Sequence, residues 1–476
     1  MRKASVSKSS KSAATHKSNT KNKSDFLNSK RFEFLSNALL TLNESFQNLP
    51  YFKNTAPGSK RLGDVLTATA QRLQDNYPYF HPLYAGQMLK PPHPVAQLAY
   101  ALAMTINPNN HALDGGRATS AMEKEAIAHL AAMFGWKKFL GHLCGGGTMA
   151  NLESLWVAGQ SAPGKTILAS SQSHYTHERI SKVLQLPFET VASDTRGRID
   201  LKLLEQRLKH HDVGTVVVTI GTTATGSVDQ LHEILGLRKK YNFRIHADAA
   251  YGGYFILVEN LKPDTRKAFA AMGEADSIAI DPHKHGLQPY GCGCILFKDP
   301  GVGRWYKHNS PYTYFTSADL HLGEISLECS RPGAAAAALW ATQKLLPLTK
   351  RGEFAQGLAK SREAARALYK RLSADGRFIT PFAPELDIVI FALLAESVSA
   401  ASSFSRRIFE AAAKRDLHLA LAELPVHLFQ NLPPNLNRDR DTITCLRSVL
   451  MKPTHLEWVD QIWTRILASV ADVVHS

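Results

Sequence analysis

The sequence lacks long apolar runs, and it contains few cysteines for a chain of 476 residues. No run approaches the roughly 18 to 20 apolar residues that a helix needs to cross a bilayer, and the hydrophobic fraction of 44% is ordinary for a globular protein. The cysteines are odd in number and lack the paired spacing of zinc ligands. They are Cys144, Cys292, Cys294, Cys329 and Cys445. We therefore expect a soluble, cytoplasmic protein with free thiols, no metal and no membrane contact.

The opening segment lacks acidic residues, since none occurs before Asp25, and it is rich in lysine, serine and threonine. Such a composition cannot bury enough apolar surface to offset ordering entropy, so we expect a disordered basic tail over residues 1–30. A transit peptide is a less favoured alternative, because no Arg-rich amphipathic face is present. The formal charge of +15 lies partly in this tail. It leaves open a nucleic-acid or membrane-surface binder, although we expect no specific nucleic-acid partner.

Residues 31–110 are expected to form an N-terminal helical segment. Apolar residues recur at steps of three and four from Arg31 to Leu49, which predicts a helix there. A second helix is expected from Val95 to Thr105. Prolines are dense between these helices, so residues 81–94 are expected to be irregular.

Beyond residue 110, helical patterns alternate with short apolar runs typical of strands. A capping box of Ser120 and Glu123 predicts a helix from Ser120 to Phe134. The alternation over residues 111–345 indicates an α/β fold with a mostly parallel central sheet covered by helices. Residues 346–476 contain a long helix, three strand-like runs and a closing helix, which predicts a smaller C-terminal α/β domain.

Polar residues that follow apolar runs are the candidates for a site, because open parallel sheets bind ligands beyond the carboxyl ends of their strands. Lys284 is the least expected of them, since burying a lysine is costly unless it is paired or used covalently. Asp248 also follows an apolar run but could cap a helix, and His174 could be a structural histidine. Residues 145–148, Gly-Gly-Gly-Thr, precede a helix, where free N–H groups could hold an anion or the glycines could form a tight turn.

Together these positions match the needs of pyridoxal 5'-phosphate. This cofactor requires an amine for a Schiff base, a carboxylate beside its ring nitrogen, a flat group on its ring face and a phosphate cradle. Lys284, Asp248, His174 and the glycine loop can supply one of each. The sequence therefore predicts a pyridoxal-phosphate enzyme.

Several longer motifs follow one another between about His81 and Val473. They include GGRATSAMEKE, GGGTMANLESL, SQSHYTHERIS, GTTATGSVD, HADAAYGGY, DPHKHGLQPYGCGCILF and LRSVLMKPTHLEWVD. This ordered set resembles the group II pyridoxal-phosphate-dependent amino-acid decarboxylases, the family of the glutamate, aromatic-amino-acid and tyrosine decarboxylases. The resemblance implies fold type I, similar to aspartate aminotransferase, with a large cofactor-binding domain over residues 111–345. It also implies a homodimer that releases carbon dioxide from an L-amino acid.

The resemblance assigns roles to the matching positions. Lys284 would hold the cofactor as a Schiff base, Asp248 would pair with the ring nitrogen, and His174 would stack on the ring. Further cofactor contacts would come from Gly146, Gly147, Thr148, Thr223, Ala250 and His283. Arg447 would bind the substrate α-carboxylate, the alternative being a surface strand arginine. The substrate side chain would be recognised near Tyr84, Gln87 and Asp114.

The resemblance also implies a tyrosine that returns a proton to the substrate carbon, from a loop between Val302 and Gly323. Tyr314 is favoured and Tyr312 is the alternative, although each could instead pack beneath the loop. Two departures are notable. Met149 stands where the family usually has an acidic residue, and the SRPG segment at Arg331 is similar to archaeal decarboxylases and sphingosine-phosphate lyases. Arg331 therefore leaves open a carbon–carbon lyase as an alternative activity.

Overall fold

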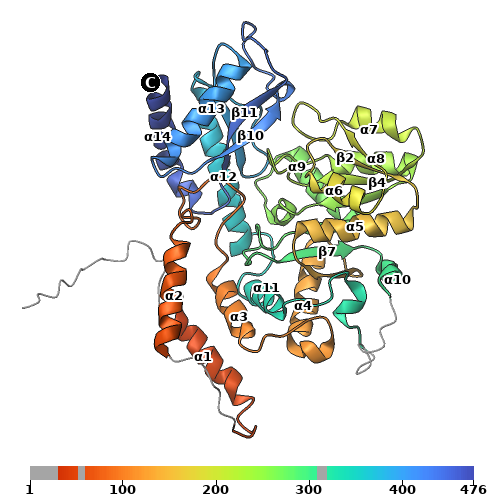
Figure 1. Cartoon of the computed structure of the whole chain (residues 1–476). Coiled ribbons are helices and arrows are strands. Elements are labelled where there is room, and N and C mark those ends of the chain that lie inside the picture. The colour runs from red at the N-terminus through yellow and green to blue at the C-terminus, as the bar shows by residue number, and fades with distance from the viewer. Residues whose placement is uncertain (1–29, 52–58, 308–318, 476) are drawn as a thin grey trace, which may run out of the picture.

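The computed structural model describes residues 30–51, 59–307 and 319–475, and Figure 1 shows their arrangement. A seven-stranded sheet in the order β1-β7-β6-β5-β4-β2-β3 forms the centre of the larger part. The five strands from β3 to β6 in this order pair in parallel, whereas β7 is antiparallel to both β1 and β6. The strands are β1 (Leu140–Cys144), β2 (Thr166–Ser170), β3 (Phe188–Val191), β4 (Val213–Thr219), β5 (Arg244–Asp248), β6 (Ser277–Ile280) and β7 (Gly293–Phe297). The predicted, mostly parallel sheet is therefore confirmed.

Helices cover the sheet because parallel neighbours need a long crossover connection, usually a helix. Every residue of β2, β6 and β7 is buried, as expected for strands covered on both faces. The helices of this part are α4 (Arg117–Met133), α5 (Gly147–Ser161), α6 (Thr176–Val183), α7 (Leu201–Leu208), α8 (Leu231–Tyr241), α9 (Pro263–Ala270), α10 (Gly303–Tyr306) and α11 (Gly333–Leu345).

The smaller part contains a four-stranded antiparallel sheet in the order β10-β11-β9-β8, drawn in blue in Figure 1. Its strands are β8 (Phe378–Ile379), β9 (Ile388–Leu393), β10 (Ala420–Pro425) and β11 (Thr442–Val449). The helices α12 (Glu353–Ala374) and α13 (Val398–Ala413) pack against this sheet, and α14 (His455–Val474) packs against both of these helices. Ser397 sets the start of α13, because its side chain accepts a hydrogen bond from the Ala400 N–H.

Two N-terminal helices extend away from the body of the molecule in Figure 1. They are α1 (Arg31–Glu44) and α2 (Ser59–Leu73), and no residue of α1 is buried. The next helix, α3 (Pro94–Met104), packs against α11, and α1 contacts the body through α3. The N-terminal helices therefore present side chains that this single chain leaves uncovered.

The irregular segment between α2 and α3 lies against the smaller part. We call residues 83–90 the N-terminal strap. The Ala85 N–H donates to the His418 carbonyl at 2.9 Å, and the His418 N–H donates to the Leu83 carbonyl at 2.9 Å. The Val449 N–H donates to the Ala85 carbonyl at 2.7 Å, at the end of β11. The strap is therefore held by backbone hydrogen bonds to strand segments more than three hundred residues later in the chain.

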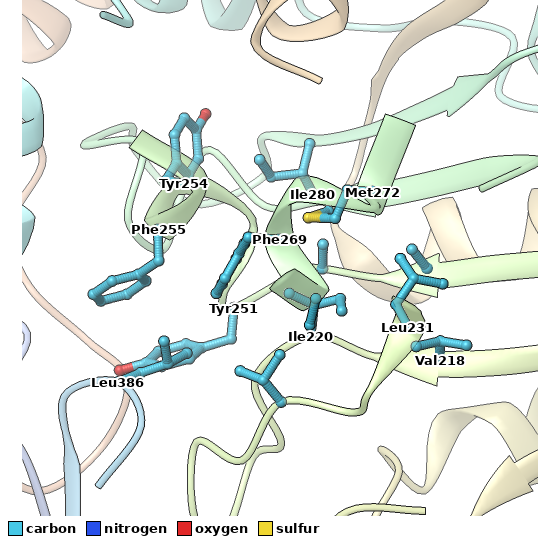
Figure 2. Packing of buried hydrophobic residues seen from close by; sticks show 14 of the residues in the cluster. Val218, Ile220, Leu231, Tyr251, Tyr254, Phe255, Phe269, Met272, Ile280 and Leu386 are labelled. Carbon is cyan, nitrogen blue, oxygen red and sulfur yellow. The ribbon is translucent and has the colours of Figure 1, made fainter. Parts of the chain in front are cut away.

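The main hydrophobic core lies against the large sheet, and Figure 2 shows part of it. Val218 comes from β4, Phe269 comes from α9, and Phe255 comes from the 3₁₀ helix Gly253–Leu257 after β5. Leu386, which precedes β9, is fully buried in the same cluster. Burying a side chain such as leucine contributes about 1.5 to 3 kcal/mol, so this residue helps to fix the smaller part against the larger one.

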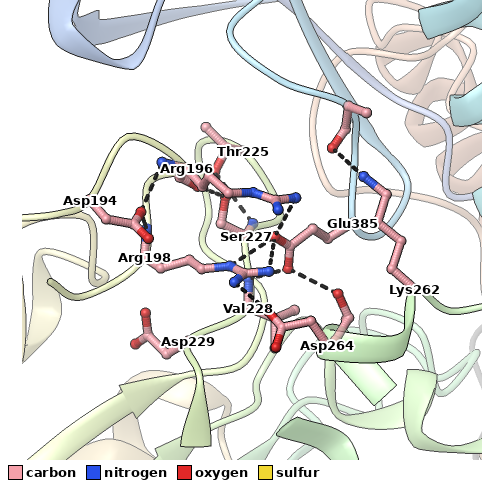
Figure 3. Close-up of polar contacts among 12 residues, drawn as sticks. Asp194, Arg196, Arg198, Thr225, Ser227, Val228, Asp229, Lys262, Asp264 and Glu385 are labelled. Atoms are coloured by element: carbon pink, nitrogen blue, oxygen red, sulfur yellow. Dashed lines mark hydrogen bonds and ion pairs between the residues drawn. The ribbon is translucent and has the colours of Figure 1, made fainter. Parts of the chain in front are cut away.

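A buried ion-pair network reinforces the same junction (Figure 3). Glu385, next to Leu386, accepts hydrogen bonds from Arg198 Nε at 2.9 Å and Nη2 at 2.6 Å. Arg198 Nη1 also donates to Asp264 at 2.7 Å. The Val228 N–H donates to the other oxygen of Glu385 at 3.1 Å. Because removing one partner would leave a buried charge unpaired, this network disfavours separation of the two parts.

The predicted capping box is wrong. Helix α4 begins at Arg117, and Ser120 and Glu123 lie buried inside it. The Glu123 carboxylate accepts hydrogen bonds from the Leu143 N–H at 2.9 Å and from Arg331 Nη1 at 2.6 Å. This buried pairing across the fold takes the place of a local cap.

Among the described residues, no helix is both long enough and apolar enough to cross a membrane. The same ranges contain no group of three or more His, Cys, Asp or Glu side chains placed to hold a metal ion. All five cysteines are free, and Cys329 is the exposed one.

Candidate active site

A cavity of about 480 Å³ lies at the carboxyl ends of β4, β5 and β6. Every position that the sequence predicted for the cofactor contributes to its lining. These positions are Gly146, Gly147, Thr148, His174, Thr223, Asp248, Ala250, His283 and Lys284. The structure thus brings together segments that are separated by up to about 140 residues in the sequence.

Asp248 is the last residue of β5 and is buried. Its Oδ2 atom accepts hydrogen bonds from His177 Nε2 at 2.8 Å and from Asn151 Nδ2 at 3.2 Å. Burial alone would raise the pKa of Asp248, but the hydrogen bond and charge of His177, with the charges of His246 and Lys284, outweigh it and hold the pKa well below its usual range. The cavity therefore contains a carboxylate that stays ionised at all physiological pH values.

Lys284 follows β6 by four residues, and its amine faces the cavity with 21% of the side chain exposed. Its Nζ atom forms an ion pair with Asp281 Oδ2 at 3.0 Å. The second Asp281 oxygen is buried and has no hydrogen-bond partner in the described structure. His283 lies beside this pair, and its Nδ1 atom donates to the Cys292 carbonyl at 2.9 Å. The lysine amine is thus held in place by a carboxylate and remains accessible to a ligand.

The glycine loop ends at the N-terminus of α5, which begins at Gly147. Gly146 has a φ of +145°, a conformation that residues with side chains rarely adopt. A Cβ atom on Gly147 would lie 2.8 Å from Asp281 Oδ2, so a side chain would intrude into the cavity. The free N–H groups of the first helical turn and the Thr148 hydroxyl therefore border an open space, which suits an anion.

His174 is half-buried and lines the same cavity. The Thr176 N–H donates to His174 Nδ1 at 3.3 Å, so this nitrogen is an acceptor and the neutral ring carries its proton on Nε2. Burial lowers the pKa of His174, which favours this neutral form. A flat, uncharged ring is therefore fixed at the cavity wall.

Three of the predicted substrate residues, Arg447, Gln87 and Tyr84, lie together beside the cavity rather than in its lining. Arg447, on β11, is buried, and its Nη1 atom donates to Gln87 Oε1 at 3.3 Å. Its Nε and Nη2 atoms are buried without a hydrogen-bond partner among the described residues. Burial lowers the pKa of Arg447, and the nearby Tyr84, Tyr251 and Asp387 oppose this effect. An unsatisfied guanidinium of this kind is costly unless a ligand completes its hydrogen bonds.

Asp114 lies in the 3₁₀ helix Leu113–Gly115, just before α4, and is not part of the lining. Tyr312 and Tyr314 lie outside the described residues.

Sequence reasoning missed several residues that shape the site. His177 follows His174 by three residues, so both lie within one helical turn of the same segment, a spacing that could have indicated it. Asn151 follows Gly147 by four residues on α5, and Asp281 lies three residues before Lys284 in the DPHKHG motif. These short spacings from predicted site residues are visible in the sequence.

Asp387 had no comparable signal in the sequence. The Tyr251 hydroxyl donates to its Oδ1 atom at 2.6 Å, and His285 Nε2 lies 3.3 Å from its Oδ2 atom. Burial raises the pKa of Asp387 to about 6, against the effect of the Tyr251 hydrogen bond. This carboxyl group links the segment before β9 to residues that directly follow Ala250 and Lys284.

The residues present fit pyridoxal 5'-phosphate. The amine of Lys284, the ionised carboxylate of Asp248 and the side-chain-free cradle at Gly147 face one cavity, and these are the groups that an aldehyde, a protonated ring nitrogen and a phosphate require. The fold and the site together define a fold type I protein for this cofactor. The conserved domain of the pyridoxal-dependent decarboxylase family matches residues 159–394 of this chain.

Curated relatives carry decarboxylase names. An L-tyrosine decarboxylase from Levilactobacillus brevis is 29% identical over 407 residues, covering 64% of each chain. A probable L-tyrosine/L-aspartate decarboxylase from Methanothermobacter thermautotrophicus is 29% identical over 268 residues, covering 54% of this chain and 70% of that protein. The chain thus spans somewhat less than two thirds of the length of the L. brevis relative.

Solved structures share the fold. The crystal structure of mouse CSAD superposes with a TM-score of 0.74 at 18% identity, covering 92% of this chain and 98% of that one. Tryptophan decarboxylase from Catharanthus roseus, solved with L-tryptophan, gives a TM-score of 0.71 at 16% identity, covering 93% and 97%. At these identities the likeness establishes the architecture.

Proposed function

We propose that the protein is a pyridoxal-phosphate-dependent decarboxylase that releases carbon dioxide from an L-amino acid and leaves the amine. The observation that carries this proposal is the buried Arg447 guanidinium, which has two nitrogen atoms without hydrogen-bond partners in the described structure. It lies close to Tyr251, a residue of the cavity lining. A substrate carboxylate accepts hydrogen bonds in the planar geometry that a guanidinium offers.

A few side chains would share the work of the decarboxylation with the cofactor. When bound, the cofactor supplies an electron-accepting ring that stabilises the electron pair left as the bond from Cα to the carboxylate breaks. Lys284 would carry the cofactor and yield its place to the substrate amine. Asp248 would keep a negative charge beside the ring nitrogen, and Arg447 would hold the leaving carboxylate. Tyr314, with Tyr312 as the alternative, stays our proposed donor of the proton that returns to Cα.

The names of the relatives suggest which substrates to test first. They act, by name, on L-tyrosine, on L-tyrosine or L-aspartate, and on aspartate in the case of a protein from Aliivibrio fischeri. Gln87 and Tyr84, beside Arg447, supply an amide and an aromatic ring for the substrate side chain. We therefore propose an aromatic or acidic L-amino acid as the substrate.

The carbon–carbon lyase alternative loses the feature that motivated it. Arg331 is buried and donates to Glu123 and to the Leu143 carbonyl, both at 2.6 Å. It is not part of the lining of the cavity at Lys284. Its charge is paired with Glu123 outside that cavity, so Arg331 gives no support for a second substrate phosphate beside Lys284.

We also propose that the protein acts as a cytoplasmic homodimer. Apolar side chains of α1 and α2 and their flanks are exposed in the single chain, and a stable monomer rarely leaves so many uncovered. They are Phe32, Phe34, Leu40, Phe46, Leu49, Leu62, Val65, Leu66 and Leu73. A second copy is the common solution for such a surface, and the five free cysteines are consistent with a reducing compartment.

Sedimentation tests the dimer. A mass of about twice 52.4 kDa is expected for the purified chain. Leu66→Glu, on α2, should shift the protein towards the monomer, whereas Leu203→Glu, at an exposed position of α7, should not. A parent protein that is monomeric and fully active at the assay concentration would contradict the proposal.

Carbon dioxide release tests the activity. The purified protein should be yellow, should release carbon dioxide from one or a few of the twenty amino acids, and should lose its colour on borohydride treatment with the label on Lys284. Lys284→Ala should keep its fold but lose turnover. Release of an aldehyde from a phosphorylated amino alcohol would favour the lyase, and a colourless protein that binds DNA would favour a binding role for the tail.

A further inference from the structure

A second cavity, of about 420 Å³, lies between the N-terminal strap, α12 and the turn after β11. We call it the strap cavity. It shares no lining residue with the cavity at Lys284. Four of its lining residues, Lys90, His285, Ser361 and Lys452, are buried polar groups. Glu353 and Lys360 of α12 also line the cavity and are exposed. The strap cavity is thus a pocket with a polar, basic interior and an opening to solvent.

Each buried lysine has few hydrogen-bond partners. Lys90 is 9% exposed, and its Nζ atom donates to the Met451 carbonyl at 3.3 Å. Lys452 is 5% exposed, and its Nζ atom donates to the Tyr84 carbonyl at 2.6 Å. An ammonium group has three donors, so within the described residues each of the two keeps donors without a protein acceptor. Buried lysines are rarely found without a carboxylate partner.

The charges around the two ammonium groups do not balance. The carboxylate that acts on Lys90 is Asp387, which also accepts the Tyr251 hydroxyl. Burial lowers the pKa of His285 well below its usual value, so its ring is neutral. Asp387 thus offsets the charge of Lys90, whereas the charge that acts on Lys452 is that of Lys90, which leaves an excess of about one positive charge. The other titratable groups near the cavity are the histidines His81, His93 and His455 and, at its mouth, Glu353 and Lys360.

This imbalance has a measurable cost. Burial lowers the pKa of Lys90 to about 8 and that of Lys452 to about 7, and the two charges also repel each other. An anion between the two amines would favour the charged form of both. The cavity is therefore arranged so that an anion would relieve an unfavourable state.

We propose that the strap cavity binds a small organic carboxylate, with the carboxylate group on the amines of Lys90 and Lys452 and the apolar body against the walls. A monoanion matches the excess charge. The walls contain the apolar residues Phe80, Pro91, Pro92, Leu287, Phe354 and Leu358. The volume of about 420 Å³ is that of ordinary small-molecule sites, which run from about 300 to 1,000 Å³.

The site would communicate with the active site over a short path. His285 lines the strap cavity and directly follows Lys284, which lines the other cavity. Lys452 follows Arg447 by five residues, beyond the end of β11. A ligand in the strap cavity would therefore contact His285 and Lys452, which are close in sequence to Lys284 and Arg447, without contacting Lys284 or Arg447.

Calorimetric titration of the purified full-length chain with sodium benzoate, in phosphate-free buffer, tests this proposal. Benzoate remains ionised throughout, so any dependence of its affinity on pH reports the protein. The affinity should be highest below about pH 7 and should fall as the pH rises above about 8, because the free amines then lose their protons. Protons should be taken up from the buffer on binding near pH 7.5. An affinity that is independent of pH would overturn the proposal.

Variants separate the two cavities. Lys90→Met and Lys452→Met should each weaken benzoate binding about tenfold or more, since each removes a charged hydrogen bond. Lys182→Met, which removes an exposed lysine of α6, should leave binding unchanged. Arg447→Gln should also leave it unchanged. Benzoate binding that is lost in Arg447→Gln but kept in both methionine variants would assign the ligand to the active site and refute the strap site. If one methionine variant does not fold, the other variant and the proton uptake of the parent still decide whether benzoate binds in the strap cavity.

Discussion

Replacing His177 by alanine tests how the fold keeps Asp248 ionised. His177 is fully buried, and its Nε2 atom donates to Asp248 Oδ2 at 2.8 Å. In the variant, the carboxylate keeps the weaker contacts from Asn151 Nδ2 and the Ala250 N–H, both at 3.2 Å. Burial, which favours the neutral acid, then acts against fewer opposing groups. The pKa of Asp248 should therefore rise.

The magnitude follows from the bond that is lost. A hydrogen bond to a charged group contributes about 1.5 to 3 kcal/mol, so the proton affinity of Asp248 should rise by about tenfold or more. Because the folded-state pKa of Asp248 is depressed, its ionisation stabilises the fold above about pH 4 and this contribution is lost as the pH falls. His177→Ala should thus be less stable than the parent at pH 7 by about 1.5 to 3 kcal/mol. This difference in the free energy of unfolding should narrow as the pH falls.

The assay is the free energy of unfolding, measured by chemical denaturation from about pH 2 to pH 7. The loss of stability in His177→Ala should be full at pH 7 and should shrink as the pH falls below about 4, because the carboxylate of the unfolded chain then takes up a proton. His177→Gln should restore part of the stability because its amide can donate. His142→Ala is the matched control, since His142 is equally buried and donates to Glu153 at 2.9 Å, away from the cavity. It should lose stability while keeping its kcat at pH 7. A loss of stability in His177→Ala that is the same at pH 3 and pH 7 would refute the reasoning.

Three further outcomes are expected. Asp248→Asn should lower kcat by orders of magnitude with little change in KM, because a neutral amide cannot stabilise a protonated ring nitrogen; a parental kcat would reassign the ring partner. Arg447→Gln should raise KM by about tenfold or more, while substrate amides, which lack the carboxylate, should bind both proteins equally in a competition assay. Deletion of residues 1–24 should leave turnover and the yellow colour unchanged, and lost turnover in a folded, yellow truncation would give that segment a role.

The site residues that the sequence predicts best are those at or just after the carboxyl ends of strands. The apolar runs that end at Asp248 and before Lys284 are β5 and β6, adjacent and parallel, so their ends necessarily meet at one edge of the sheet. The glycine loop at Gly147 leads into α5, as its pattern indicated. Local patterns and the rule for parallel sheets sufficed for these residues.

The unpredictable part depends on contacts between distant segments. Glu123 looked like a local cap, yet it pairs with Arg331 across 208 positions. Asp387 contacts Tyr251 across 136 positions, from the segment before β9, whose placement no local pattern reveals. Such pairs are set by how helices and sheets pack, and a single sequence contains no periodic signal for them.

The N-terminal strap has a consequence for how the chain reaches its native state. Lys452 Nζ binds the Tyr84 carbonyl across 368 positions, and the strap's backbone hydrogen bonds join the same distant segments. Contacts so far apart in sequence form slowly, because a long loop must close before they are made. During synthesis, the strap leaves the ribosome well before β11 exists to receive it. The contacts at the end of β11 are therefore completed only when the strap and the C-terminal segments meet. A nascent chain stalled before β11 would keep its strap exposed to chaperones and proteases.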